Sequence, residues 1–259
     1  MNTRWAAMGL TIVTIILLGL GYVFIHNQNR SNTTEPRQAN ISPMQESDSQ
    51  TPPLLIKHLG VNLAPYDPKT NRAGDFVFTK QKLQFDRIFM GFGFVIPANS
   101  IGAQKANPQP TFILPLGTKV HSLVDGVVAN MPKLYSGDYS IQVSTNGQIQ
   151  KWLYETEHVT NPLVKVGERV KAGQIIAEVS NYDHGAPDGF GIVEIGILKG
   201  GNPPYHVCPF LYLDPSIKET VYANLRNFYK AWNAYLGKIV YDEKDYIVPG
   251  CLTTSEIQG

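Results

Sequence analysis

Between residues 111 and 199, short β-type segments alternate with strong turn signals, and this pattern most limits what the chain can fold into. Asn146-Gly147, a dipeptide that favours tight hairpin turns, lies between two such segments. Short apolar runs bounded by glycine and proline are typical of antiparallel strands. We therefore expect a mainly β fold, an antiparallel β-sandwich, with strands at Phe112–Leu114, Gly126–Ala129, Tyr139–Ser144, Trp152–His158, Gln174–Val179 and Gly191–Leu198.

The periodicity of the apolar residues changes after residue 213. Apolar side chains now recur every three or four positions, at Val221, Leu225, Phe228, Trp232 and Tyr235. This spacing places them on one stripe of a helix. Asp214 followed by Pro215 is a typical helix start, and Gly237 is a typical stop. The sequence therefore predicts one C-terminal helix that docks its aromatic stripe onto the sheet.

The N-terminal segment from Trp5 to Ile25 carries no charged residue and consists largely of small and aliphatic side chains. As a helix it would reach about 31 Å, the thickness of the hydrocarbon core of a bilayer. A cleaved signal peptide is the alternative, but its apolar region is usually shorter and ends in small residues. We expect an uncleaved single-pass anchor at residues 1–26, with the globular domain on the extracytoplasmic side of the cell membrane.

Four further segments follow the predicted anchor. Residues 27–53 are almost free of apolar side chains, which predicts a disordered polar tether. Residues 54–110 are predicted to form a β-rich extension, residues 111–200 the regular β domain, and residues 201–259 a C-terminal helical extension. Lys and Arg together number 22 and Asp and Glu 21, so the basic face that nucleic-acid binding requires is not expected.

The sequence contains two cysteines, Cys208 and Cys251. Disulfides persist outside the cytoplasm, and the globular domain is expected there. We therefore predict a Cys208–Cys251 bridge that closes a loop around the C-terminal helix. Two unpaired thiols are the alternative.

Two phrases of the β domain carry a family resemblance. The first is Leu116-Gly117-Thr118-Lys119-Val120 followed by Val124-Asp125-Gly126-Val127-Val128, and the second runs from Val164 to Ala177. In order and spacing they resemble the lysostaphin/LytM-type zinc metallopeptidases of bacterial cell-wall metabolism, which have the duplicated hybrid motif fold. Biotinyl, lipoyl and membrane-fusion-adaptor domains share the second phrase alone. The resemblance covers roughly residues 110 to 200.

The resemblance also implies where zinc ligands would lie. The family's H-x-x-x-D motif would fall at residues 107 and 111, and its late H-x-H at residues 190 and 192. These positions hold Asn107, Thr111, Phe190 and Ile192. A catalytic zinc ion needs three protein ligands, and Thr, Phe and Ile do not supply them. We therefore expect the zinc ligands to be lost and hydrolysis by the family's mechanism to be absent.

Two elements of the family's catalytic machinery are retained. His158 corresponds to the His of the family's Y-x-H-L strand, and Glu194 follows the late H-x-H. We predict both as catalytic remnants. Tyr154 is expected to border the same groove, because side chains of a strand repeat on one face every second residue. Asp183 and His184, in a loop before the last core strand, are further candidate binding residues.

The sequence thus predicts a membrane-anchored, extracytoplasmic LytM-like domain that is catalytically inactive and acts by binding. Its partner would be a cell-envelope glycan or peptide, or a protein such as a cell-wall hydrolase, which relatives without zinc ligands bind. The alternative is an active, metal-dependent cell-wall endopeptidase that holds zinc through non-standard ligands. His121 could join the candidates above in such a rebuilt site.

Overall fold

The computed structural model describes residues 49–98, 103–182 and 186–259. The predicted membrane anchor and nearly all of the predicted tether lie outside these residues, as do Asp183 and His184. Within the described ranges, no helix combines the length and the hydropathy that a membrane crossing requires.

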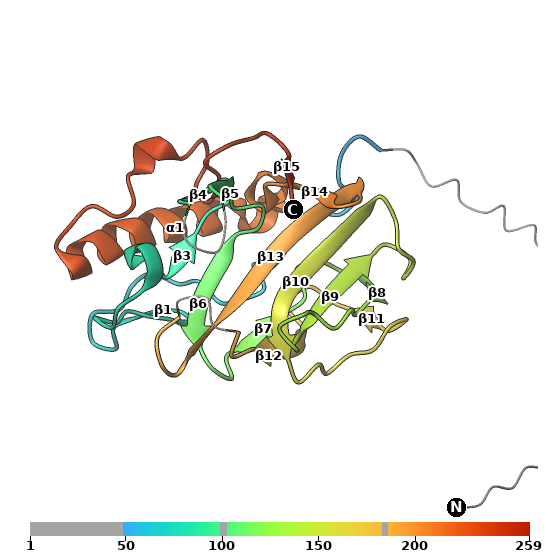
Figure 1. The fold of residues 1–259 in the computed structure, drawn as a ribbon, viewed down its shortest axis with the longest axis horizontal. Coiled ribbons are helices and arrows are strands. Elements are labelled where there is room, and N and C mark those ends of the chain that lie inside the picture. The colour runs from blue at the N-terminus through green and yellow to red at the C-terminus, as the bar shows by residue number, and fades with distance from the viewer. Residues whose placement is uncertain (1–48, 99–102, 183–185) are drawn as a thin grey trace, which may run out of the picture. The chain divides into compact units, whose positions relative to one another are not determined.

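Strands dominate the described structure, and one long helix follows them near the C-terminus (Figure 1). The N-terminal part contains the two-residue strands β1 (Arg72–Ala73), β2 (Phe76–Val77), β3 (Phe89–Met90), β4 (Val95–Ile96) and β5 (Lys105–Ala106). The central part contains β6 (Thr111–Pro115), β7 (Lys119–His121), β8 (Gly126–Asn130), β9 (Tyr139–Ser144), β10 (Trp152–Thr160), β11 (Arg169–Val170), β12 (Ile175–Val179) and β13 (Phe190–Gly201). The C-terminal part contains β14 (Pro204–Val207), α1 (Pro215–Leu236) and β15 (Ile257–Gln258). Short 3-10 turns lie at Gln84–Asp86, Pro209–Tyr212 and Glu243–Asp245.

The long strand β13 pairs with three other strands of the sheet. It pairs with β6 through residues 190–194, with β10 through 194–199 and with β14 through 197–201. Through these pairings eleven strands join in one antiparallel network, in which β9 and β8 continue outward from β10. Figure 1 shows β13 crossing the middle of this sheet, with β6 on one side and β10 on the other.

The predicted mainly β, antiparallel fold with one C-terminal helix is confirmed. Each of the six predicted strands coincides with one of the observed strands, and β9 and β10 pair across the Asn146-Gly147 turn. The pairing joins all the central strands through β13, so the finer division into a two-layer sandwich stays a prediction. The C-terminal extension is only partly helical, because β14 and β15 add an edge to the sheet.

The helix α1 buries the predicted apolar stripe. Val221, Leu225, Phe228 and Trp232 are all buried, whereas Tyr235 is partly exposed. The carboxylate of Asp214 caps the first turn by accepting a hydrogen bond from the Ser216 amide at 2.9 Å. Gly237 ends the helix with a φ of 69°, a conformation that glycine adopts without strain.

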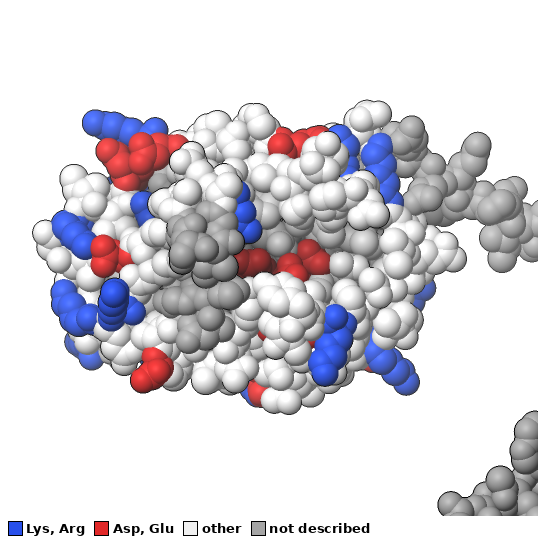
Figure 2. All heavy atoms as spheres, in the orientation of Figure 1, with Lys and Arg blue, Asp and Glu red and all other residues white. Residues whose placement is uncertain are grey.

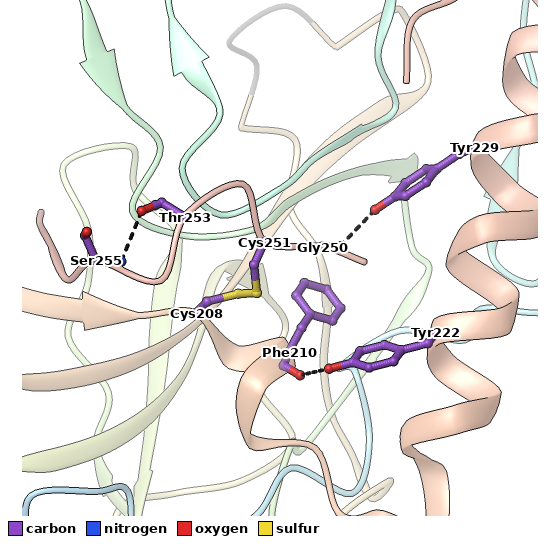
Figure 3. The surroundings of a disulfide bond; sticks show 8 residues. All are labelled: Cys208, Phe210, Tyr222, Tyr229, Gly250, Cys251, Thr253 and Ser255. Carbon is purple, nitrogen blue, oxygen red and sulfur yellow. Dashed lines mark hydrogen bonds between the residues drawn. A yellow bond between two sulfur atoms is a disulfide. The ribbon is translucent and has the colours of Figure 1, made fainter. Parts of the chain in front are cut away.

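Cys208 and Cys251 form the predicted disulfide (Figure 3). The bridge joins the residue after β14 to the C-terminal segment beside α1. Two tyrosines of α1 form hydrogen bonds with backbone groups near the disulfide. The hydroxyl of Tyr222 donates to the Phe210 carbonyl at 2.8 Å, and the Gly250 amide donates to the hydroxyl of Tyr229 at 3.0 Å. The disulfide therefore lies where the helix, the sheet edge and the C-terminal segment meet.

Candidate functional site

A cavity of about 1420 Å³ opens over the part of the sheet where β10 and β13 pair. Figure 2 shows acidic atoms at the bottom of a hollow near the middle of this face. The carboxylates of Glu155, Glu157 and Glu194 line the cavity, together with apolar side chains such as Leu134 and Leu198. Its volume exceeds the roughly 300 to 1,000 Å³ that is typical of small-molecule pockets.

The alternation of side chains along β10 explains why two of the glutamates face the cavity. Successive residues of a strand point to opposite faces, so Glu155 and Glu157 share one face while Tyr154 and Thr156 are buried on the other. The antiparallel register then places Glu194 of β13 directly opposite Glu157. Three carboxylates therefore gather on adjacent strands.

A β-bulge near the end of β10 brings His158 to the same cavity. The register with β9 shifts between Thr156 and Val159, and His158 has a φ of 59°. The bulge interrupts the two-residue alternation, so His158 lines the cavity and Tyr154 does not. The expected place of Tyr154 beside the groove is therefore corrected. Its hydroxyl instead donates to the Leu54 carbonyl at 2.7 Å and accepts from the Leu54 amide at 2.6 Å.

His158 is held in a buried polar cluster at one end of the cavity. Its Nδ1 lies 3.1 Å from Oδ2 of Asp138, and its ring stacks on Tyr182 with 3.7 Å between ring centroids. Asp138 also accepts hydrogen bonds from the hydroxyls of Ser136 and Ser180. A carboxylate beside Nδ1 fixes the orientation of an imidazole ring. The His158 ring therefore lines the cavity in a fixed orientation.

Hydrogen bonds and apolar contacts occupy the positions where the resemblance implies zinc ligands. The Asn107 amide donates to the Gln109 carbonyl at 2.6 Å and to Oγ1 of Thr111 at 3.2 Å. Oγ1 of Thr111 in turn donates to Oε1 of Glu194 at 2.9 Å. Ile192 contributes an apolar side chain to the cavity wall. At the two early positions, Thr111 therefore holds the carboxylate of Glu194, and Asn107 supports Thr111.

The remaining candidates do not complete a zinc site. Phe190 packs partly buried against the hydrophobic core, and His121 lies away from the cavity with its ring 4.6 Å from that of His58. Among the residues that the structure describes, no three His, Cys, Asp or Glu side chains are arranged to hold a metal ion. The donor set therefore does not fit the zinc that the resemblance implies. Asp183 and His184, which a rebuilt site would need, lie outside the described residues.

Glu155 is the most deeply buried of the three glutamates and is 4% exposed. Its carboxylate accepts hydrogen bonds from Ser140 at 2.5 Å, from Gln142 at 2.7 Å and from the side-chain amide of Gln109 at 2.9 Å. These donors come from β9 and from the segment before β6. The network fixes the middle of the cavity floor.

Burial raises the pKa of all three glutamates. Burial, together with the neighbouring charges of Glu155 and Glu194, raises the pKa of Glu157 to about 8. Burial raises the pKa of Glu194 to about 7, although the hydrogen bond from Thr111 opposes this shift. For Glu155, burial raises the pKa against the effect of its three hydrogen bonds. The cluster therefore retains protons near neutral pH and gains negative charge as the pH rises towards 8.

The sequence predicts His158 and Glu194 in the groove, and both line the cavity. It did not single out Glu155, Glu157 or Gln109. The available signal was the pair of acids two residues apart in a predicted strand. Such a pair must share one face of the sheet.

Comparison with known proteins adds a family match for this part of the chain. Residues 111–195 match the model of Peptidase family M23. The peptidoglycan DD-endopeptidase ShyC of Vibrio cholerae serotype O1 (strain ATCC 39315 / El Tor Inaba N16961) is 32% identical over 116 residues, which are 44% of this chain. The chain spans only 26% of the length of that relative. Residues 111–195 are accordingly similar to an M23 peptidase domain of the lysostaphin/LytM type.

Two solved structures are similar to part of this chain. The catalytic domain of lysostaphin from Staphylococcus simulans is 23% identical, with a TM-score of 0.35, and the match covers 43% of this chain and 79% of that one. A zinc-containing peptidase from Vibrio cholerae is 25% identical, with a TM-score of 0.36, and the match covers 57% of this chain and 39% of that one.

Proposed function

We propose, on the premise that residues 111–195 are an M23-type domain, that this domain binds a peptide or glycan of the cell envelope without hydrolysing it. The proposal rests on the residues that line the cavity where the resemblance implies zinc ligands. Asn107 and Thr111 are engaged in hydrogen bonds there, and Ile192 is apolar. The cavity itself remains large and polar, which supports a role in binding.

The ligand class follows from the relatives and from the cavity. The curated relative is named for its action on peptidoglycan, and a chain that has kept the cavity but not the metal ligands can retain recognition of the same polymer. A concave cavity of about 1420 Å³ suits a slender peptide or glycan better than the surface of a folded protein. We therefore place a peptidoglycan strand ahead of a cell-wall hydrolase as the partner.

Binding without cleavage is tested by incubating the full-length protein with purified peptidoglycan sacculi. We expect the protein to sediment with the sacculi and to be displaced by soluble peptidoglycan fragments, with no new fragments detected by mass spectrometry. Heat-unfolded protein is the control for non-specific adsorption. Release of cleaved cross-links, or failure of the folded protein to sediment, would contradict the proposal.

Anchoring in the cell membrane with the domain outside the cytoplasm is part of the same proposal. The charge-free run from Trp5 to Ile25 supports it, as does the Cys208–Cys251 disulfide, because such bridges persist mainly outside the cytoplasm. Alkaline phosphatase, which needs disulfides to be active, is expected to be active when it is fused after residue 60. An inactive fusion, or a soluble mature protein that begins near residue 26, would refute this arrangement.

A further inference from the structure

Beside the glutamate cluster, the side chains of Gln109 and His206 pack against Gly196 and form a polar cradle that borders the cavity. Gly196 of β13 pairs with Glu155 of β10. A Cβ atom at this position would lie 3.2 Å from Nε2 of Gln109 and 3.5 Å from Nδ1 of His206. Because Gly196 has no side chain, these two polar side chains, both of which line the cavity, can lie close to β13.

The imidazole ring of His206, on β14, forms one side of this cradle, and its Nδ1 is buried. The residue is 4% exposed, and its Nδ1 has no hydrogen-bond partner among the described residues. Burial lowers the pKa of the ring to about 4, so the imidazole is neutral at neutral pH and can accept a hydrogen bond. Buried polar atoms in proteins nearly always have partners, so a ligand that donates an N–H would satisfy this one.

Among the described residues, no cationic side chain forms an ion pair with the nearby carboxylates. The ion pairs of the described residues engage other acids, and none of them includes Glu155, Glu157 or Glu194. The charge of Lys105 lowers the pKa of Glu194, but the two side chains form no ion pair. The site therefore combines several hydrogen-bond acceptors with carboxyl groups that no cation of the described residues pairs with, and these carboxyl groups ionise as the pH rises towards 8.

We propose that the cavity binds a protonated primary amine on an aliphatic chain, such as a lysine-type side chain of a peptide. The ammonium group would lie between Glu157, Glu194 and the cradle at Gly196. An ammonium has three N–H donors and no acceptor, and it complements these carboxylates and the neutral ring of His206. Leu198 on the cavity wall would contact the alkyl chain. The inference rests on the proposed function and names the chemistry of its ligand.

The proposal predicts that binding tightens as the pH rises. The titratable and charged groups that face the cluster are Lys82, Lys105, Tyr135, Asp138, Glu155, Glu157, His158, Tyr182, Glu194 and His206. A bound ammonium favours the ionised carboxylates, so binding releases protons from the glutamates. The amine itself, with a pKa near 10.4, stays charged up to pH 8.5. We expect affinity to rise about tenfold or more between pH 6 and pH 8.5.

An NMR titration of the full-length protein tests this chemistry with Nα-acetyl-lysine methylamide and with its norleucine counterpart, which lacks the amine. We expect saturable shifts with the lysine probe at pH 8.5, weaker binding at pH 6, and no binding of the norleucine probe. The double substitution Glu157→Gln and Glu194→Gln should abolish binding. Gly196→Ala, whose methyl group would press on the side chains of Gln109 and His206, should weaken it about tenfold or more. Glu219→Gln, an exposed change on α1, is the matched control and should bind like the wild type.

The outcomes separate this inference from the proposed function. Equal binding of the two probes, or no binding of the lysine probe at pH 8.5, would overturn the inference. Sacculi whose free amines have been acetylated should be retained less than native sacculi. Equal retention of both would refute the inference and leave the proposed function intact. Binding of the lysine probe without retention of native sacculi would refute the proposed function alone. Urea unfolding of each variant checks that a loss of binding is not a loss of fold.

Discussion

The Glu157→Gln variant should be more stable than the wild type at pH 8.5 and equally stable at pH 4. Below pH 4.5, Glu157 is protonated in both the folded and the unfolded chain, so the substitution changes little. Between pH 4.5 and about 8 the unfolded chain is ionised, whereas the folded protein keeps the proton. The folded state then loses stability as the pH rises, by about 1.4 kcal/mol for each pH unit.

Glutamine removes this penalty, because it cannot ionise and has nearly the shape of a protonated glutamate. We expect a gain of about 3 to 5 kcal/mol in the free energy of unfolding at pH 8.5, measured by urea denaturation at several pH values. Glu219→Gln, at an exposed position on α1, should show no comparable pH-dependent gain. An equal effect of Glu157→Gln at pH 4 and pH 8.5 would show that the carboxylate is not buried as described.

Removal of the disulfide should cost about 4 kcal/mol of unfolding free energy. Cys208 and Cys251 are separated by 43 positions in the sequence. Cross-linking a loop of this length lowers the entropy of the unfolded chain and so raises its free energy by about 4 kcal/mol. We expect Cys208→Ser combined with Cys251→Ser to lower the urea midpoint strongly without changing the fold. The double variant avoids the unpaired thiol that either single change would leave.

As a control, urea unfolding of the wild-type protein is measured with and without reductant. Reduction should lower its stability to nearly that of the double variant and should have no effect on the double variant itself. Equal stability of the reduced and oxidised wild type, or two alkylatable thiols in the unreduced protein, would contradict the bridge.

Local sequence signals were sufficient for most of the secondary structure. The strands between residues 111 and 199 are separated by turns that contain residues such as Gly147, whose φ of 81° suits glycine. The stripe of α1 follows from helical periodicity alone. These features depend on neighbours in the sequence, so the sequence predicts them well.

The candidate site was harder to predict, because it depends on pairing between distant segments. The bulge at His158 arises where β10 and β9 shift register, and only that shift separates His158 from the face of Tyr154. Likewise, Glu157 faces Glu194 because β10 pairs with β13. The cradle at Gly196 depends on His206, from a strand that the sequence did not indicate. The family resemblance located His158 and Glu194, but it could not show which contacts Asn107 and Thr111 make.

We propose above that this M23-type domain binds its ligand without zinc, and elemental analysis of the purified full-length protein, with peptidoglycan cleavage assayed in the same sample, tests this directly. We expect zinc well below one atom per chain and no cleavage, with or without added zinc. One tightly bound zinc per chain, together with cleavage that chelator and His158→Ala both abolish, would contradict it.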